Sequence, residues 1–358
     1  MRVAIRVDGS SAMGSGHLMR CLTLANGMRQ GGDLVTFISR AHDGNMIDFL
    51  REQGHVVIAL PGPPPGRLEG YAAWLGVSPS QDADETIAAL SGPVDVLVVD
   101  HYGIDAIWEQ ALSAHAKAVM VIDDLAERRH DCDLLLDQNL VADLENRYHG
   151  LLPPRAHTLL GPAYGLVRPE FAGLRSASLA RRQSFGLASL LIFMGGGDPD
   201  DDTSKALEGA LLSGIRWEQI DVVVGLSYAG RDALAQRIAG NPEVALHVQT
   251  PHMARLMADA DLAITTGGSI SWEKCVLGLP SLVAVQADNQ TAIAAALGEA
   301  GAQINLGRSS ALMPGDYATG LRSLWPGKLR ATSQAASAIC HGDGVKRVLA
   351  AIYEILQS

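Results

Sequence analysis

Residues 94–100 read VDVLVVD, and residues 117–123 read KAVMVID. Each stretch is apolar on both faces of the strand it would form, a pattern typical of parallel strands covered by helices above and below. We expect helices to begin near His17, Gly44, Asp82 and Asp105. The first half of the chain is therefore predicted to be a doubly wound α/β domain. Its other strands are expected at residues 3–7, 34–38, 56–60 and 133–136.

The same alternation restarts after residue 186. Residues 187–200 read LASLLIFMGGGDPD, a strand that leads into a glycine loop. Further strands are expected at residues 220–224, 244–247, 262–265 and 281–285. The predicted fold class is α/β, with two doubly wound Rossmann-like domains facing across a cleft. Ligands of such sheets lie at the carboxyl ends of the strands, so the glycine loops are expected to line that cleft.

The domain boundaries follow from changes in this pattern. We expect residues 1–160 to form the first domain and residues 186–330 the second. Residues 161–185 are predicted to connect them, and residues 331–358 to form a C-terminal helical segment. Residues 61–70 read PGPPPGRLEG and are expected to be a loop, because prolines and glycines interrupt regular structure.

Composition excludes several functional classes. The net charge of the 358 residues is -11, which disfavours a nucleic-acid partner. The four cysteines are far apart, form no zinc-binding pair and are expected to be free thiols. No apolar run approaches the ~20 residues that a membrane span requires, and the N-terminus does not look like a signal peptide. We therefore predict a cytoplasmic protein with no membrane partner, and we take a monomer as the expectation.

The first candidate site is the loop DGSSAMGSGHLMR at residues 8–20. Gly14 and Gly16 allow a ligand to approach the backbone, and His17 follows at the start of a helix. The positive end of the helix dipole disfavours an imidazolium ion, so His17 is predicted to be a neutral general base. A histidine that only caps or packs the helix is the alternative.

The second candidate site is a glycine loop in the second half of the chain. Gly267, Gly268 and Ser269 stand between a strand and a helix, where free amide groups bind anions such as phosphate. Glu273 lies on the same helix face as Ser269 and is predicted to accept hydrogen bonds from a ribose diol. Alternatively, Ser269 is only an N-cap and Glu273 a solvated helix residue.

Two other segments are expected at the same strand ends. In MGGGDPDDDT (residues 194–203), Gly195 and Gly196 expose the backbone to a ligand, or the loop is a plain turn with Asp200 or Asp201 as N-cap. Asn289 and Gln290 follow the strand at 281–285 and are predicted to point toward the ligand.

Carboxylates end two strands of the first half. Asp100, His101 and Tyr102 follow one strand, and Asp123 and Asp124 follow the next, so both groups are expected near His17. Residues 130–133 read HDCD, which resembles a metal site in composition. Because adjacent residues rarely converge on one ion, we predict no metal.

Taken together, the motifs resemble a known family, the nucleotide-sugar hydrolases of pseudaminic acid biosynthesis. The resemblance covers residues 1–307 and rests on GSGHLMRCLTLA, VVDHYGID, IDDLAERRHDCDLLLDQN, LLGPAYGLVRPEF, FMGGGDPD and TTGGSISWEKCVLGLPSLVAVQADNQ. It implies a GT-B fold and hydrolysis of UDP-2,4-diacetamido-2,4,6-trideoxy-β-L-altropyranose at C1, with inversion and without cofactor or metal. Gly197 departs from the serine that is common at that position of the family.

The resemblance also implies roles for individual residues. His17 would be the catalytic base, and Tyr102 would lie near the sugar. The segment with Gly267, Gly268, Ser269 and Glu273 would bind UDP, and Asn289 would touch the phosphate or the sugar. The alternatives are a GT-B UDP-sugar glycosyltransferase, a UDP-sugar 2-epimerase and a nucleotide-sugar sensor without catalysis.

Overall fold

The computed structural model describes residues 1–64, 68–184 and 186–357, which form two compact units. Unit 1 comprises Met1–Asn139, Asp143–Leu166 and Asp343–Ser358, and unit 2 comprises Leu140–Ala142 and Val167–Gly342. Residues 65–67 of the loop expected at 61–70 lie outside the described residues. None of the helices in the described part of the chain combines the length and the apolar content that a membrane span requires.

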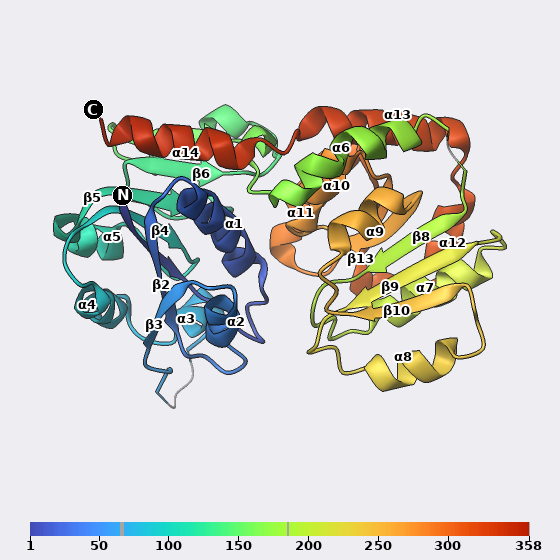
Figure 1. Cartoon of the computed structure of the whole chain (residues 1–358), viewed down its shortest axis with the longest axis horizontal. Coiled ribbons are helices and arrows are strands. Elements are labelled where there is room, and N and C mark those ends of the chain that lie inside the picture. The colour runs from blue at the N-terminus through green and yellow to red at the C-terminus, as the bar shows by residue number, and fades with distance from the viewer. Residues whose placement is uncertain (65–67, 185, 358) are drawn as a thin grey trace. The chain divides into compact units, whose positions relative to one another are not determined.

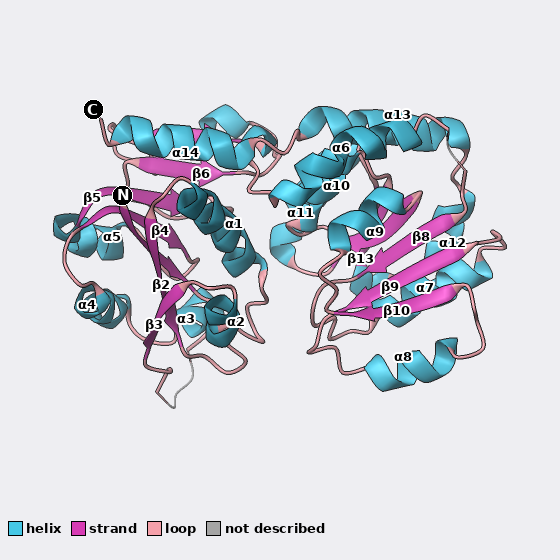
Figure 2. Cartoon of the chain, in the orientation of Figure 1, coloured by secondary structure: helices cyan, strands magenta, loops and turns pink. Residues whose placement is uncertain are grey.

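A parallel sheet of seven strands, in the order β3-β2-β1-β4-β5-β6-β7, forms the centre of unit 1 (Figure 2). Its strands are β1 (Arg2–Val7), β2 (Leu34–Arg40), β3 (Val56–Leu60), β4 (Val94–Asp100), β5 (Ala116–Ile122), β6 (Leu134–Asp137) and β7 (His157–Leu160). Its helices are α1 (Gly16–Gln30), α2 (Ile47–Glu52), α3 (Gly70–Leu75), α4 (Pro79–Ala89), α5 (Ala106–Leu112) and α14 (Gly344–Ile355). Three short 3-10 turns complete the described part of this unit: η1 (Ser113–His115), η2 (Leu144–Asn146) and η3 (Pro162–Tyr164).

The residues of β4 enter two separate cores, as the apolar sequence of this strand predicts. Val96 and Val98 pack in a core with α1 and α14, whereas Leu97 and Val99 pack in a core with α5. Successive side chains of a strand point to opposite faces, so helices cover both faces of the sheet. The prediction of buried parallel strands in the first half is confirmed.

Unit 2 is built in the same way around a parallel sheet of six strands, in the order β10-β9-β8-β11-β12-β13. Its strands are β8 (Ser189–Phe193), β9 (Gln219–Val224), β10 (Val244–Val248), β11 (Leu262–Thr266), β12 (Ser281–Val285) and β13 (Ile304–Arg308). Its helices are α6 (Pro169–Arg181), α7 (Asp202–Leu212), α8 (Arg231–Ile238), α9 (Met253–Asp259), α10 (Ile270–Leu277), α11 (Thr291–Glu299), α12 (Pro314–Arg322) and α13 (Pro326–Ile339), with 3-10 turns η4 (Asp288–Gln290) and η5 (Ser309–Ala311).

Each sheet has one point at which the strand order reverses. In unit 1 the chain moves outward from β1 to β3 and then returns to place β4 on the other side of β1. In unit 2 the corresponding reversal lies between β8 and β11. Ligands of open α/β sheets bind outside the carboxyl ends of the strands at such a switch point. The loops after β1, β4, β8 and β11 are therefore the places to look for function.

The contacts divide the chain differently from the ranges expected from the sequence. Helix α6, which falls entirely in the expected connection, belongs to unit 2, and the final helix α14 belongs to unit 1 (Figure 1). The contact between α14 and α1 requires Gly27, because a Cβ there would lie 2.7 Å from Cγ1 of Val345. Tyr353 of α14 also donates a hydrogen bond to Asp33 at 2.8 Å.

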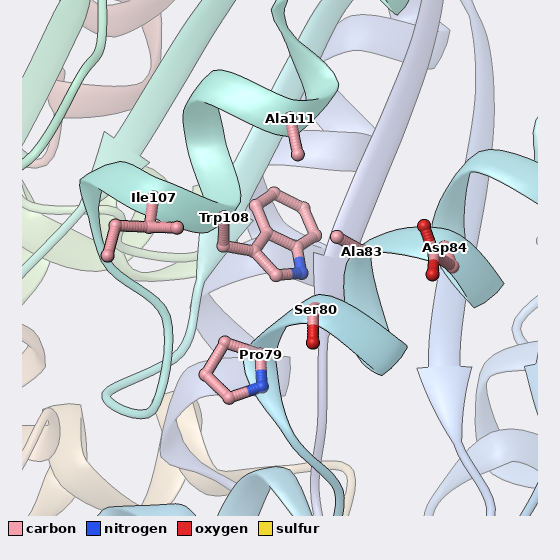
Figure 3. A pocket seen from close by; sticks show the side chains of 7 residues that line it. All are labelled: Pro79, Ser80, Ala83, Asp84, Ile107, Trp108 and Ala111. Carbon is pink, nitrogen blue, oxygen red and sulfur yellow. The ribbon is translucent and has the colours of Figure 1, made fainter.

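Buried charges tie α4 to the strands β1 and β2. Both oxygens of Asp82 accept hydrogen bonds from Arg6, at 3.0 and 2.7 Å, and Arg40 adds a third bond at 2.6 Å. The indole nitrogen of Trp108 donates a fourth at 3.0 Å. Figure 3 shows Trp108 between α4 and α5, where it lines a small cavity of about 110 Å³ that contains none of the predicted site residues.

Replacing Asp82 by Asn should destabilise the protein by about 1–3 kcal/mol, because the buried guanidinium groups of Arg6 and Arg40 each lose one of two carboxylate partners. Asp84→Asn is the matched control, since Asp84 is exposed on the same helix. Urea unfolding measures both. Equal midpoints for the two variants would show that the buried network does not stabilise unit 1.

A buried lysine lies directly behind the loop that follows β11. Lys274 of α10 is 2% exposed, and its ammonium donates to Thr265 Oγ1 at 2.9 Å and to Gln303 Oε1 at 3.3 Å. Both partners are uncharged, and burial lowers the pKa of Lys274 to about 7 from 10.5. Between these two values the unfolded chain binds more protons than the folded one, so stability rises with pH in this window.

We expect Lys274→Met to remove part of this pH dependence. The free energy of unfolding of the wild type should rise by on the order of 1 kcal/mol or more from pH 7 to pH 10 relative to the variant. Lys346→Met, at an exposed position of α14, is the control and should keep the wild-type slope. A parallel slope for Lys274→Met and wild type would contradict the pKa shift.

Candidate functional site

His17 is the second residue of α1, at the switch point of unit 1. Its side chain is 12% exposed, and its Nδ1 lies 2.6 Å from Oδ1 of Asp100, the last residue of β4. The N-cap residue Ser15 makes no side-chain capping bond, so its hydroxyl does not cap the first turn. The sequence places His17 at the helix start, and the structure adds a carboxylate that fixes which ring nitrogen faces inward.

Asp100 is buried and held by a second partner. Arg20, one helical turn after His17, donates to both carboxylate oxygens, at 2.6 and 2.7 Å. Burial by itself raises the pKa of Asp100, but the Arg20 guanidinium and His17 lower it well below its usual range. Asp100 is therefore a permanent anion that accepts a hydrogen bond from Nδ1–H of His17. In that tautomer Nε2 is the proton acceptor of the imidazole.

The same arginine joins a second carboxylate. Nη1 of Arg20 donates to both oxygens of Asp124, at 2.9 and 2.7 Å. Asp124 also accepts hydrogen bonds from the Tyr102 hydroxyl and from the Asn139 amide, each at 2.7 Å. The structure thus brings the loops after β1, β4 and β5 together, as their strand-end positions predict.

The rings of Tyr102, Trp74 and Tyr71 form an aromatic cluster beside His17. Tyr102 meets the imidazole edge-on with a centroid distance of 4.5 Å, and Trp74 of α3 does so at 6.1 Å. Trp74 stacks on Tyr102 at 5.6 Å, and Tyr71 meets both of these rings edge-on. Apolar walls on one side and fixed charges on the other are typical of a site that orients a reacting base.

The two glycines before His17 have different local roles. Gly14 has φ +74°, and its amide donates to the carbonyl of Ser10 at 2.9 Å, which closes a tight turn. A side chain there would be strained although a Cβ would meet no neighbouring atom within 4 Å. Gly16 is the first residue of α1. A ligand role for either glycine remains a prediction.

In unit 2, Gly267 and Gly268 follow β11, and Ser269 is the N-cap of α10. The Ser269 hydroxyl makes no capping bond, and within the described part of the chain the amide of Ile270 donates to no carbonyl or side chain. A helix start with an uncommitted amide donor suits an anion, as the sequence predicts for this loop.

Glu273 lies one turn into α10 and is 19% exposed on its side chain. Its Oε1 accepts hydrogen bonds from Nε and Nη2 of Arg168, both at 3.1 Å. Partial burial raises the pKa of Glu273, and the Arg168 charge opposes this shift. Oε2 accepts no hydrogen bond from the residues that the structure describes. Glu273 is therefore ion-paired and not only solvated, and its predicted role as a ribose acceptor stays a prediction.

The loop after β8 packs against the loops after β9 and β12. Gly195 has φ +91°, and a Cβ on it would lie 3.7 Å from Oε1 of Gln286. A Cβ on Gly225 would lie 2.1 Å from the carbonyl oxygen of Gly196, so glycine is required where these loops touch. Asp201 is the N-cap of α7 and accepts a hydrogen bond from the Ser204 amide, as one of the two predicted caps.

The turn η4 contacts both Gln286, which follows β12, and Gly267, which follows β11. The amide of Gln286 donates to Oε1 of Gln290 at 3.1 Å, and its side chain donates to Asp198 and to Asp202. A Cβ on Gly267 would lie 3.3 Å from Cβ of Gln290. Asn289 is exposed on the same turn. The predicted residues of unit 2 thus lie at the ends of β8, β11 and β12.

The HDCD stretch at residues 130–133 has structural partners. His130 pairs with Glu109 at 2.7 Å, Arg155 forms ion pairs with Asp131 and Asp133, and Cys132 is buried in a core. No group of three metal-ligating side chains suited to an ion occurs among the described residues.

Sequence reasoning missed several residues of the site. Arg20 could have been found from its spacing, since three residues place it one turn after His17 on the same helix face. Arg168 precedes α6 and reaches Glu273 across 105 positions, and no local pattern predicts that pair. Trp74 lies on the six-residue helix α3, which the pattern of the sequence did not reveal.

No family model matches this chain. Among curated proteins, an uncharacterized protein of Methanocaldococcus jannaschii is 28% identical to this chain. The matched region covers 81% of this chain and 57% of that relative. The spore coat polysaccharide biosynthesis protein SpsG of Bacillus subtilis is 26% identical over 100% of this chain and 99% of its own length. The UDP-2,4-diacetamido-2,4,6-trideoxy-β-L-altropyranose hydrolase of Campylobacter jejuni is 25% identical over 85% of this chain and 98% of its own length.

Solved structures resemble the whole chain. The crystal structure of Acinetobacter baumannii MurG superposes with a TM-score of 0.68 at 15% identity and covers 99% of both chains. Arabidopsis thaliana UGT89C1 complexed with UDP has a TM-score of 0.65 at 14% identity and covers 98% of this chain and 99% of its own. Together with the two parallel sheets, these likenesses show that the chain has a GT-B fold made of two Rossmann-like domains.

Proposed function

We propose that this chain is a UDP-sugar hydrolase that releases UDP from UDP-2,4-diacetamido-2,4,6-trideoxy-β-L-altropyranose by attack of water at C1 with inversion. The observation that carries the proposal is the His17 imidazole at the switch point of unit 1, with Nδ1 bound to the buried Asp100 anion. A curated relative with this activity in its name, at 25% identity, supports the choice of substrate.

In this proposal His17 is a general base. Asp100 holds Nδ1–H, so Nε2 accepts a proton from the attacking water. The water oxygen forms the new bond to C1 while the bond from C1 to the phosphate oxygen breaks, and the electron pair of that bond leaves with UDP. Asp100 remains an anion throughout and stabilises the imidazolium that forms, because Arg20 already holds its pKa low.

Unit 2 holds the UDP moiety in this proposal. The amides around Gly267, Gly268 and Ser269 face the diphosphate, together with those of Gly195 and Gly196. Glu273 binds the ribose through Oε2. Asn289 and Gln290 contact the phosphate or the sugar.

In this proposal unit 1 binds the sugar. Tyr102 lies beside the sugar, with its hydroxyl fixed by Asp124, and the loop with Gly14 and Gly16 approaches it through its backbone. UDP is a good leaving group, so the proposed mechanism uses no cofactor, no metal and no general acid. Fixed amide dipoles stabilise the negative charge on the departing phosphate. We further propose that the protein acts in the cytoplasm as a monomer.

A GT-B glycosyltransferase is the second candidate, because the same fold occurs in the spinosyn rhamnosyltransferase SpnG complexed with its aglycone. One assay separates the two functions and the 2-epimerase. The purified protein is incubated with the UDP-sugar in water, and NMR follows the products. Free sugar inverted at C1 and unchanged at C2, together with UDP, supports hydrolysis, and a sugar inverted at C2 supports the epimerase. An intact UDP-sugar that is turned over only after an acceptor is added supports transfer.

His17→Asn should lower turnover by about 10²–10⁴-fold, the usual contribution of a general base, and leave UDP affinity unchanged. Asp100→Asn should lower turnover as well, because the imidazole loses the partner that sets its tautomer. His149→Asn, at an exposed position of unit 1, is the control. Wild-type turnover in His17→Asn would refute the role of this residue.

Glu273→Ala should weaken UDP binding about tenfold or more, since a charged acceptor for the ribose hydroxyls is lost. Titration calorimetry with UDP measures the effect. Glu299→Ala, exposed at the end of α11, serves as the control. Equal affinities for both variants would mean that the ribose binds elsewhere.

A further inference from the structure

A cavity in unit 1 lies beside the aromatic cluster and has no role in the mechanism above. Its volume is about 490 Å³, within the range of small-molecule sites. Ala12 and Met13 of the β1–α1 loop, Tyr71 and Trp74 of α3, and His42 after β2 contribute to its walls. Because Trp74 also meets the His17 ring, one wall of the cavity is continuous with the proposed base.

The cavity is built between two loops that are fixed to each other. The amide of Ser11 donates to the carbonyl of Asp43 at 3.3 Å. Gly44 has φ +64°, which favours glycine, and a Cβ on it would lie 2.0 Å from Oγ of Ser11, so the two loops are in close contact. The cavity is therefore preformed between the β1 and β2 loops.

Its walls are mainly carbon. The alanine, methionine and aromatic side chains outnumber the polar ones, which are Ser10, His42 and Asp43. A hexose with hydroxyl groups at every carbon would lose hydrogen bonds to water here without replacing most of them. A sugar with methyl and acyl groups buries apolar surface instead and needs few polar partners.

One of the polar wall residues, His42, lies against the buried carboxylate of Asp8. Oδ2 of Asp8 lies 3.6 Å from Nε2 of His42 and 3.5 Å from Nε2 of His101, and these three atoms are buried without a hydrogen-bond partner among the described residues. Nδ1 of His101 accepts from the Gly103 amide at 2.9 Å, so its Nε2 carries the proton. The Asp8 anion favours the same tautomer in His42, which leaves Nδ1 of His42 as an acceptor for an amide N–H.

We propose that this cavity binds the N-acylated, deoxygenated sugar ring of the substrate, with Trp74 and Tyr71 as its apolar platform and His42 as a positioning residue that accepts a hydrogen bond from an acylamino group. The inference rests on the proposed function, for which it names the sugar-binding residues. It predicts that the enzyme selects acylamino-deoxy sugars over UDP-linked hexoses that carry only hydroxyl groups.

Trp74→Ala should raise KM for the UDP-diacetamido sugar about tenfold or more and leave the Kd for UDP within twofold of wild type. Trp74→Phe keeps an apolar ring and should recover most of the loss, and His42→Ala should raise KM in the same way. Ala72→Ser, exposed on the same helix and outside the cavity walls, is the control. A KM for Trp74→Ala within twofold of this control would overturn the proposal.

A second measurement keeps the inference separate from the activity. Saturation-transfer NMR with the free 2,4-diacetamido sugar should show contact with the wild type and a loss of signal with Trp74→Ala. If the wild type releases no UDP but this difference persists, the proposed hydrolysis fails and the sugar site stands. If the free sugar gives equal signals with both proteins, or none with either, the sugar site is wrong.

Discussion

The buried carboxylate of Asp100 is the interaction on which the site of unit 1 depends. It ends the central strand β4 and receives both the Arg20 guanidinium and the His17 imidazole from α1. A carboxylate in this position, without a counter-charge, would cost several kcal/mol. Arg20 supplies that charge and also pairs with Asp124, so one turn of α1 fixes the His17 imidazole, the Asp100 carboxylate and, through Asp124, the hydroxyl of Tyr102. The orientation of His17 is thus a property of the packed sheet and not of a loop.

Most of the fold could be predicted because parallel strands carry their burial in their own sequence. VDVLVVD is apolar on both faces, and the structure distributes its residues between two cores. The strand-end rule also placed His17, Asp100, Tyr102 and Asp124 together, and the observed hydrogen bonds agree. What remained out of reach were contacts between segments far apart in sequence, such as Arg168 with Glu273, and the short helix α3 that carries Trp74. The packing of α14 in unit 1 is another contact between segments far apart in sequence.

The two units use the same architecture for different chemistry. At the switch point of unit 2, the loops offer main-chain amides, and the nearby charges of Asp198 and Asp202 are held by Gln286. At the switch point of unit 1, the loops offer an imidazole, two carboxylates and aromatic rings. Amide dipoles suit a diphosphate, and a carboxylate-backed imidazole suits proton transfer.

Helix α14 covers the apolar face of α1 through the close approach at Gly27, although more than 300 residues separate the two helices. During synthesis, α1 leaves the ribosome early, and its covering helix follows only after all of unit 2. Until α14 has been synthesised, the apolar face of α1 lacks the helix that covers it and is open to other proteins. The contact between α14 and α1 forms late and is long-range, so we expect unit 1 to complete its folding more slowly than unit 2, whose helices and strands all lie within residues 167–342.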